Sequence, residues 1–262
     1  MESDMKNSPR TARGYDLCGN IVVIDAAPEA AKGIGRKLML ENKNIETVLR
    51  KGGAVKGRYR TRKFIYVSGR RNYLATYREN GCVFSFDIRK AFFSTRLAFE
   101  RKRVSSLVRN GERVVVMFAG VGPYSIEIAK LHKKCKVISI ELNASASVYA
   151  KENARLNKTP NVVVEQGSVE KFGKKYAGFA DRIIMPLPKD SASFLHTALE
   201  MCGRRCTIHY YAFCKADRTV EEIDKLRAFF TIRKRRFKLL DQRTVRPYSA
   251  TDIELAVDFV VY

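Results

Sequence analysis

The sequence predicts an α/β protein in which a parallel, doubly wound sheet follows a smaller α+β domain. Two observations support this architecture. Beyond about residue 87, near-continuous apolar runs of strand length alternate with helix-like segments, as in strands buried on both faces of a parallel sheet. Before that point, strand formers punctuated by glycines predominate. We therefore expect a flexible tail at residues 1–17, a small α+β domain at 18–86 and the sheet domain at 87–262.

The first part of the chain predicts a tail, a strand and a helix. Residues 1–17 are polar and contain Pro, Ser, Gly and Arg, which is typical of a flexible terminus. The apolar run at 21–24 predicts a strand. Residues 28–41 predict a helix, because Pro28 suits the first helical turn and an apolar side follows it.

The remainder of the small domain, residues 44–86, is β-like. Aromatic and β-branched residues recur there between glycines. Residues 73–77 and 82–86 are separated by a segment containing Asn80-Gly81, a pair favoured in tight hairpin turns. We therefore expect these two runs to pair as a hairpin.

The sheet domain is predicted from apolar runs with helices between them. The alternation ends after the fourth unit, and two long closing strands fit an antiparallel edge. The predicted strands are 113–118, 136–142, 161–166, 182–186, 206–213, 231–240 and 253–262, and the predicted helices are 124–132, 144–157, 191–202 and one from about 219.

The charge balance favours a polyanionic partner. The chain has 262 residues, with 50 Lys and Arg against 27 Asp and Glu, for a net charge of +23. Such a field favours nucleic-acid binding in both rate and affinity. A merely basic soluble protein, or one that meets anionic lipid, is the alternative on charge alone.

The same composition argues against membrane, secreted and metal-binding classes. No apolar run reaches the length of about 18 residues that predicts a membrane span. No apolar stretch follows the N-terminal charges, so no secretory signal is predicted and we expect a cytoplasmic protein. The six cysteines lack the paired spacing of zinc sites, so we expect reduced structural thiols and no metal.

A strand that runs into a glycine turn carries the clearest chemical signal. Gly120 and Gly122 follow the apolar run and precede a predicted helix, so the backbone can approach a ligand closely beside free N–H groups. Glu141 ends the next strand about 20 residues further on, where an acid can bind both ribose hydroxyls of a nucleotide-like cofactor. An ordinary strand–helix turn that binds no ligand is the alternative, and these residues alone also allow NAD as the cofactor. The dinucleotide fingerprint lacks its third glycine, which favours S-adenosylmethionine.

Several longer motifs carry a family resemblance that covers about residue 19 to the end. The chain resembles the archaeal and eukaryotic tRNA guanine-N1 methyltransferases, which modify position 37 beside the anticodon. The matching segments are GNIVVID (19–25), ENKNIETVLRKGGAVKGRYRTR (41–62), ENGCVFSFDIRKAFFSTRLAFER (79–101), MFAGVGPYSIEIAK (117–130), ENARLNK (152–158), IIMPLPKDSASFL (183–195) and IHYY (208–211). The combination within 92–124 is the most specific part.

This resemblance implies a fold, a reaction and a set of site residues. The fold is a class I, Rossmann-like methyltransferase sheet preceded by a small α+β domain, the donor is S-adenosylmethionine, and the acceptor is guanine N1. That nitrogen must lose a proton, so a general base is needed, and the match places it at Glu100. Arg60, beside Arg58, matches the arginine that stabilises the guanine carbonyl oxygen. The residues implied around the cofactor and target are Phe92, Arg96, Phe118, Gly120, Gly122, Glu141, Leu142, Ser168 and Pro186.

The chain departs from the family pattern in three places. Pro186 stands where relatives commonly have an asparagine near the target guanine, and Ser168 replaces an acid that meets the adenine amino group. Both changes bear on base specificity and cofactor affinity. Seventeen residues ahead of the small domain are too few for the additional N-terminal domain of many relatives. We therefore expect a monomer whose tRNA recognition rests on its two domains.

Basic residues interleaved with aromatic ones suit contact with an anticodon stem-loop. Such clusters combine phosphate contacts with stacking on unpaired bases, although a charged strand edge is the alternative for the last of them. The clusters are Lys51, Lys56, Arg58, Arg60, Arg62 and Lys63 with Tyr59 and Phe64; Arg70, Arg71 and Arg78 with Tyr73 and Tyr77; and residues 233–238.

Other functions stay open from the sequence. The related transfer of an aminocarboxypropyl group in wybutosine synthesis is one, although Arg96-Leu97 argues against it; methylation of a tricyclic guanine derivative is another. A non-catalytic tRNA-binding protein is the third, and the Pro186 and Ser168 changes are the features in its favour. Separately, a solvated helix-face charge pair with Arg101 is the alternative for Glu100, and a phosphate contact or a surface strand position is the alternative for Arg60. The three histidines show no partner spacing and are predicted to be structural.

Overall fold

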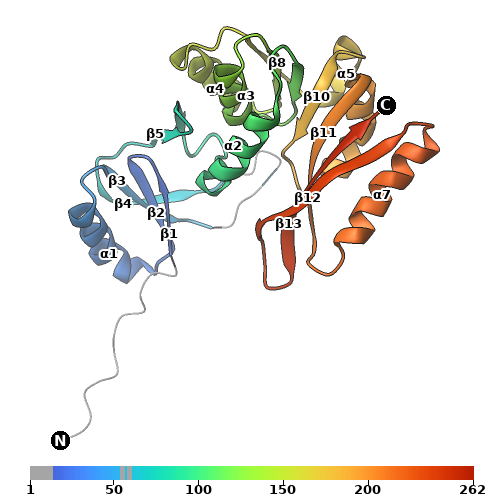
Figure 1. Cartoon of the computed structure of the whole chain (residues 1–262). Coiled ribbons are helices and arrows are strands. Elements are labelled where there is room, and N and C mark those ends of the chain that lie inside the picture. The colour runs from blue at the N-terminus through green and yellow to red at the C-terminus, as the bar shows by residue number, and fades with distance from the viewer. Residues whose placement is uncertain (1–13, 54–56, 58–60) are drawn as a thin grey trace, which may run out of the picture. The chain divides into compact units, whose positions relative to one another are not determined.

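The chain forms two units, which Figure 1 shows in its blue-to-red colouring. The structure, a computed structural model, describes residues 14–53, 57 and 61–262. Contacts within the chain group Met1–Glu79 with Val83–Thr95, and Asn80–Cys82 with Arg96–Tyr262. In the described part of the chain, no helix combines the length and apolarity needed to cross a membrane.

The N-terminal unit is built around a sheet in which the order of strands is β1-β2-β3-β4 among the described residues. The central strands β2 and β3 are parallel because α1 connects them, whereas β1 and β4 pair antiparallel at the edges. The predicted strand and helix at 21–24 and 28–41 are confirmed, and β1 begins within the segment predicted as a tail. The elements are β1 (Tyr15–Cys18), β2 (Ile21–Ile24), α1 (Pro28–Glu41), β3 (Thr47–Lys51) and β4 (Phe64–Gly69).

A two-stranded hairpin follows this sheet. Its strands are β5 (Leu74–Glu79) and β6 (Cys82–Asp87). Asn80 and Gly81 between them have φ angles of 47° and 75°, both in the left-handed region that a tight primed turn requires. The hairpin predicted from the Asn-Gly pair is therefore confirmed.

The C-terminal unit contains the doubly wound sheet that the sequence predicts. Among the described residues its strand order is β12-β13-β11-β10-β7-β8-β9. The strands from β11 to β9 are parallel, and β13 and β12 extend the sheet antiparallel, as predicted for the closing strands. Its elements are α2 (Ala98–Leu107), β7 (Arg113–Val116), α3 (Pro123–Leu131), β8 (Lys136–Glu141), α4 (Ala144–Leu156), β9 (Val162–Gln166), α5 (Val169–Gly173), β10 (Ala180–Met185), α6 (Leu195–Met201), β11 (Cys202–Lys215), α7 (Thr219–Ile232), β12 (Phe237–Pro247) and β13 (Asp252–Val261).

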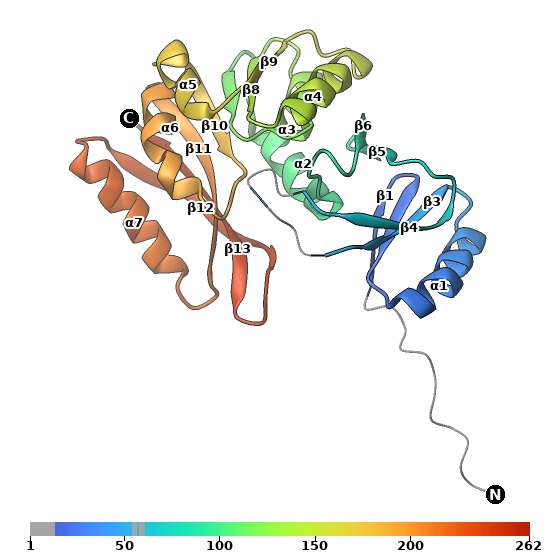
Figure 2. The ribbon, with the colours of Figure 1, turned by 180° about the vertical axis from the view of Figure 1, so that it is seen from behind.

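Helices cover both faces of this sheet, and the strands alternate their side chains between the two layers. On one face, α5, α6 and α7 enclose a core that includes Val115 of β7 and Met117 directly after this strand (Figure 2). On the other face, α2 and α3 enclose a second core that includes Val114 and Val116 of the same strand. The sheet is thus buried on both sides, which explains why its strands are continuously apolar in sequence.

Two predictions for the C-terminal unit need correction. The strand predicted at 231–240 is wrong at its start, because α7 continues to Ile232 and buries Phe230, and Lys234 then takes a left-handed φ of 55° in the turn before β12. Helix α2 was not predicted at all. Its buried positions include Glu100, Arg101 and Ser105, so the usual apolar stripe is missing.

Candidate active site

A glycine turn joins β7 to α3 at the carboxyl edge of the parallel sheet. Phe118, Gly120 and Gly122 have φ angles of 54°, 59° and 88°, so the backbone here follows a conformation that is costly for most residues. Gly122 lies directly before α3, and a Cβ atom added to it would meet the Ile126 side chain at 3.1 Å. The turn therefore brings a backbone stretch with few side-chain atoms to the start of a helix, where a ligand can approach it closely.

Glu141, at the end of the neighbouring strand β8, points at this turn. Its Oε2 accepts a hydrogen bond from Gly120 N at 2.7 Å, and its Oε1 accepts one from Asn143 N at 2.7 Å. Burial raises the pKa of the carboxyl despite these hydrogen bonds. Asn143 in turn caps α4 by accepting from Ser145 N and Ala146 N. The spacing between the glycine turn and the acid therefore does bring the two together in space.

The other positions expected around a cofactor lie at the ends of the same strands. Phe118 packs edge-on against Phe194, with ring centroids 4.8 Å apart. The Leu142 carbonyl accepts a hydrogen bond from Gln166. Ser168 follows β9 and precedes α5 without capping it through its side chain, and Pro186 follows β10. Because the carboxyl ends of parallel strands meet at one edge of a sheet, these residues border a common site.

Glu100 lies on α2 with only 1% of its surface exposed. Its Oε1 accepts hydrogen bonds from Arg103 Nη2 and from the Tyr211 hydroxyl, both at 2.6 Å, and its Oε2 accepts one from Arg103 Nε at 2.9 Å. Burial raises the pKa of Tyr211 well above its usual range, so this hydroxyl stays protonated and donates. Oε2 accepts fewer hydrogen bonds than Oε1 and is the oxygen better able to take up a proton.

A pair of tyrosines connects Glu100 to the glycine turn. The hydroxyl of Tyr211 lies 3.2 Å from that of Tyr124, which stands in the first turn of α3, two residues after Gly122. Both side chains are buried. The acid and the predicted cofactor turn are therefore parts of one hydrogen-bonded region of the C-terminal unit.

Three other predicted site residues lie outside the part of the C-terminal unit described above or outside the described residues. Arg60, and its neighbour Arg58, lie outside the described residues. Phe92 belongs to the N-terminal unit, with 39% of its surface exposed. Arg96 lies in a short 3-10 turn, Thr95–Leu97, and is exposed.

The sequence analysis missed the residues that hold Glu100. Arg103 and Tyr211 bind it directly, and Asp258 and His209 continue the network from Arg103. The signal available was a set of polar residues inside otherwise apolar strands, which indicates buried and paired side chains. His209, predicted to be merely structural, turns out to be hydrogen-bonded on both ring nitrogens.

Replacing Gly122 by Ala should destabilise the protein more than an equivalent change at an open position. We expect Gly122→Ala to lower the free energy of unfolding by about 2–3 kcal/mol, because it combines a left-handed φ with the contact to Ile126. Gly111→Ala is the matched control: its φ is 96°, but nothing lies within 4 Å of the added carbon. We expect about 1 kcal/mol there. Urea unfolding measures both, and equal losses would contradict the role of close packing at Gly122.

Comparison with known proteins places these features in a family. Residues 75–239 match the TRM5/TYW2 methyltransferase domain. The tRNA (guanine(37)-N(1))-methyltransferase Trm5b of Pyrococcus abyssi is 38% identical over 251 residues, covering 94% of this chain and 74% of that protein. A crystal structure of Trm5b from the same organism has a TM-score of 0.84 at 35% identity, covering 99% of this chain and 82% of the other.

Two further relatives extend the comparison. A solved complex of aTrm5 and tRNALeu has a TM-score of 0.80 at 29% identity, covering 95% of this chain and 72% of that one. The tRNA(Phe) (4-demethylwyosine(37)-C(7)) aminocarboxypropyltransferase of Methanocaldococcus jannaschii is 29% identical over 249 residues, covering 93% of this chain and 96% of that protein. The same fold thus accompanies two different transfer reactions among these relatives.

Proposed function

The chain belongs to the TRM5/TYW2 methyltransferase family, and we propose that it transfers a methyl group from S-adenosylmethionine to N1 of guanine 37 in tRNA. The observation that carries this proposal is the link from Glu100 through Tyr211 to Tyr124, beside the glycine turn. It joins a buried acid to the place where a nucleoside cofactor fits. A relative that is 38% identical over nearly the whole chain acts on the same nitrogen of the same nucleotide.

The residues at the carboxyl edge fit S-adenosylmethionine. The turn at Gly120 and Gly122 lets the backbone approach a ligand closely, and Glu141 presents a carboxylate to the ribose hydroxyls of a nucleoside. Phe118, Leu142, Ser168 and Pro186 end the neighbouring strands, and we assign them to the walls of the same site. When bound, S-adenosylmethionine supplies an electrophilic methyl group.

Glu100 has the proposed role of general base. Guanine N1 carries a hydrogen that must leave as the new N–C bond forms, and Glu100 Oε2 accepts it. Arg103 and Tyr211 hold the carboxylate in one orientation, so the reacting oxygen is fixed before the substrate arrives. We assign Arg60 to the guanine carbonyl oxygen, where negative charge develops, and Arg96 and Phe92 to the target pocket.

Transfer of the aminocarboxypropyl group of the same donor is the second candidate. Pro186 keeps it open, since the family resemblance implies an asparagine at this position in methylating relatives, and a relative named for that activity is 29% identical over 93% of this chain. Arg96-Leu97 favours methyl transfer. The identity of the transferred group distinguishes the two.

The proposed partner is the anticodon stem-loop of tRNA, bound by a monomer in the cytoplasm. A cation–π contact in the N-terminal unit supports an RNA-facing role, since Arg71 lies 5.2 Å from the Tyr66 ring; Arg89 lies 3.9 Å from the Tyr73 ring but is also paired with Asp87. Such pairs present charge and aromatic surface together, which suits unpaired nucleotides. Lys56, Arg58, Tyr59 and Arg60 of the first basic cluster lie outside the described residues.

Glu141→Gln should weaken cofactor binding. We expect the affinity for S-adenosylhomocysteine to fall about tenfold, because a charged acceptor at the ribose becomes a neutral one. Burial raises the pKa of Glu141, so on acidification its carboxylate becomes protonated at a higher pH than an ordinary glutamate does. In the wild-type protein, the affinity for S-adenosylhomocysteine should therefore begin to fall at that higher pH as the solution is acidified. Isothermal titration between pH 5 and 8 measures both effects. Glu152→Gln, on an exposed position of α4, is the control that should bind like wild type.

The proposed target position is tested with defined transcripts. The purified protein is incubated with S-adenosylmethionine and an unmodified tRNA carrying guanine 37, and with the same transcript carrying adenine at that position. Nucleosides are then identified by mass spectrometry. We expect N1-methylguanosine only from the first transcript. Its formation from both would show that another guanine is the target, and no modified nucleoside from either would argue for a binding role without catalysis.

A further inference from the structure

Glu100 is one end of a buried ionic network that crosses the C-terminal unit. Arg103 binds Glu100 on one side and Asp258 of β13 on the other, with Nη1 2.5 Å from Asp258 Oδ2 and Nη2 3.3 Å from Oδ1. The exposed surfaces of Glu100 and Asp258 are 1% and 4%. Arg103 therefore shares a single positive charge between two buried carboxylates.

His209 of β11 binds the same aspartate from the other direction. Its Nδ1 lies 2.7 Å from Asp258 Oδ1, and its Nε2 lies 2.7 Å from Arg182 Nη1. An arginine can only donate hydrogen bonds, so Nε2 must accept and carries no proton. The imidazole is therefore neutral, with its hydrogen on Nδ1 donated to Asp258.

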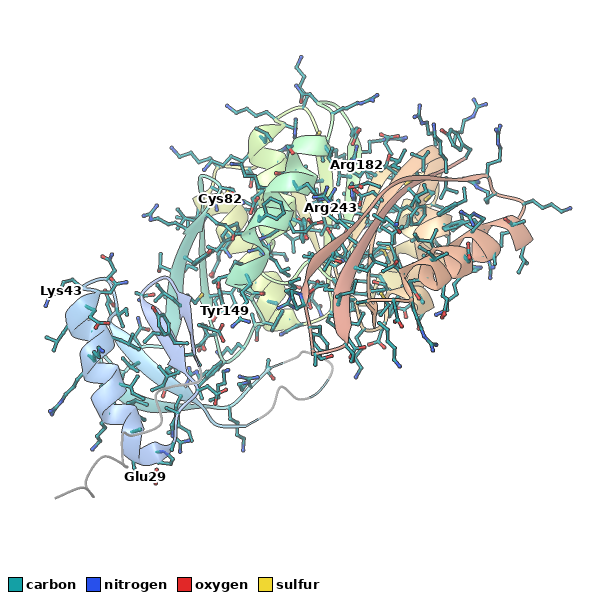
Figure 3. The ribbon with its side chains drawn as sticks, turned by 60° about the horizontal axis from the view of Figure 1, so that its bottom comes forward. Glu29, Lys43, Cys82, Tyr149, Arg182 and Arg243 are labelled. Atoms are coloured by element: carbon teal, nitrogen blue, oxygen red, sulfur yellow. The ribbon has the colours of Figure 1, made fainter. Side chains whose placement is uncertain are left out.

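Arg182 completes the network on β10. It lies among the strands of the C-terminal unit (Figure 3) and is 5% exposed. Its guanidinium donates to Glu112 Oε2 at 2.6 Å, to Glu112 Oε1 at 3.1 Å and to the Leu107 carbonyl at 2.9 Å. Because Arg182 is held at these points, it fixes the position and tautomer of His209.

We propose that Asp258, oriented by His209, is a positioning residue that enables Glu100 to accept the guanine proton. This inference rests on the proposed methyl transfer. When Glu100 takes up a proton it loses its charge, and Arg103 would be left as a buried cation if Glu100 were its only partner. Asp258 remains paired with Arg103 before and after the transfer, so the buried guanidinium is never without a counter-ion.

The charge of this cluster favours proton uptake. Two carboxylates and one guanidinium give a net charge of −1, which becomes zero when Glu100 is protonated. The hydrogen bonds of His209 and Arg103 outweigh the effect of burial and hold the pKa of Asp258 well below its usual range, so Asp258 stays ionised. Among the described residues, Tyr211 of β11 binds Glu100 directly, and Arg101 of α2 and Glu254 of β13 are charged groups that act on Tyr124 of α3, the partner of Tyr211.

The first test does not depend on activity. Two-bond ¹H–¹⁵N NMR spectra of protein labelled at histidine nitrogens distinguish the two neutral tautomers from the imidazolium. A His209→Gln sample assigns the His209 signals. We expect the neutral Nδ1–H form at pH 7. An imidazolium, or a hydrogen on Nε2, would overturn the proposed chain of contacts.

The second test measures methyl transfer in Asp258→Asn under single-turnover conditions across pH. Loss of the second carboxylate should make Glu100 a poorer proton acceptor. We therefore expect the plateau rate to fall about tenfold and the midpoint of the rise in rate with pH to move to lower pH. Affinities for S-adenosylhomocysteine and tRNA should stay as in wild type.

Glu254→Gln is the matched control, since it removes a carboxylate on the same strand that is 2% exposed and paired with Arg246. It should reduce stability and, because Glu254 is paired with Arg246 and does not bind Arg103, it should move the midpoint of the pH–rate curve much less than Asp258→Asn does. The inference would be overturned if the pH–rate curves of wild type, Asp258→Asn and Glu254→Gln had equal midpoints, or if both variants showed the same shift. The proposed function would be unaffected by either result. If wild type made no N1-methylguanosine but the His209 tautomer were as expected, the proposed function would fail, and with it the assignment of Asp258 to proton transfer.

Discussion

Glu100→Gln should lower the single-turnover rate of methyl transfer by roughly 10²- to 10⁴-fold, the usual contribution of a positioned general base. Glutamine has the same shape, and its carbonyl oxygen can still accept hydrogen bonds from Arg103 Nη2 and Tyr211, although its amide nitrogen cannot accept the one from Arg103 Nε. It cannot take up the N1 proton. Cofactor and tRNA affinities should therefore change little, so the loss appears in the chemical step. Rapid-quench measurements with excess enzyme measure this rate, and titration calorimetry measures the affinity for S-adenosylhomocysteine.

A neighbouring glutamate provides the control for this variant. Glu127 of α3 is 3% exposed and lies 3.7 Å from Arg101, so Glu127→Gln also removes a buried carboxylate close to the site. We expect that variant to react within about threefold of wild type, since it serves no proposed step. If Glu100→Gln were as fast as wild type, or if both variants were slowed equally, Glu100 would not be the base.

Arg182→Met should strongly destabilise the C-terminal unit. We expect a loss of about 3–5 kcal/mol in the free energy of unfolding, the usual result of removing one partner from a buried ionic network. The change leaves Glu112, His209 and the Leu107 carbonyl without their donor. Urea unfolding followed by circular dichroism gives the free energy.

Arg113→Met provides the matched control on the adjacent strand. Arg113 also binds a carboxylate with two nitrogens, its Nη2 lying 2.8 Å from Asp181 Oδ1, but the two side chains are 46% and 36% exposed. Solvent screens such a pair, and we expect a loss of about 0–1 kcal/mol. A similar loss in both variants would show that burial does not govern the strength of these interactions in this protein.

The parallel sheet could be predicted from sequence because its strands are buried on both faces. Continuous apolar runs such as residues 113–118 and 136–142 follow directly from that burial. Helix α2 could not be predicted, since its inner face carries Glu100, Arg101 and Ser105 in place of an apolar stripe. The start of β12 was misplaced because aromatic residues near the end of α7 resemble a strand in local pattern.

The candidate site also has one part that could be predicted from the sequence and one part that could not. The proximity of Glu141 to the glycine turn could be predicted because the turn follows β7 and Glu141 ends the adjacent parallel strand β8. The partners of Glu100 could not, because Tyr211 is 111 residues away in sequence and Asp258 is 155 residues from Arg103. Those contacts depend on the antiparallel pairing of β11 with β13, which places His209 opposite Asp258.

The identity of the transferred group tests the central claim most directly. Wild-type protein is incubated with a guanine-37 transcript and S-adenosylmethionine that carries one isotope in its methyl group and another in its aminocarboxypropyl group. Nucleosides are then separated and their masses measured. Methyl transfer to guanine 37 predicts that only the methyl isotope enters the tRNA, as N1-methylguanosine. The rate of this incorporation should fall by roughly 10²- to 10⁴-fold in Glu100→Gln. Incorporation of the aminocarboxypropyl isotope instead, or methylation that does not depend on Glu100, would contradict the account.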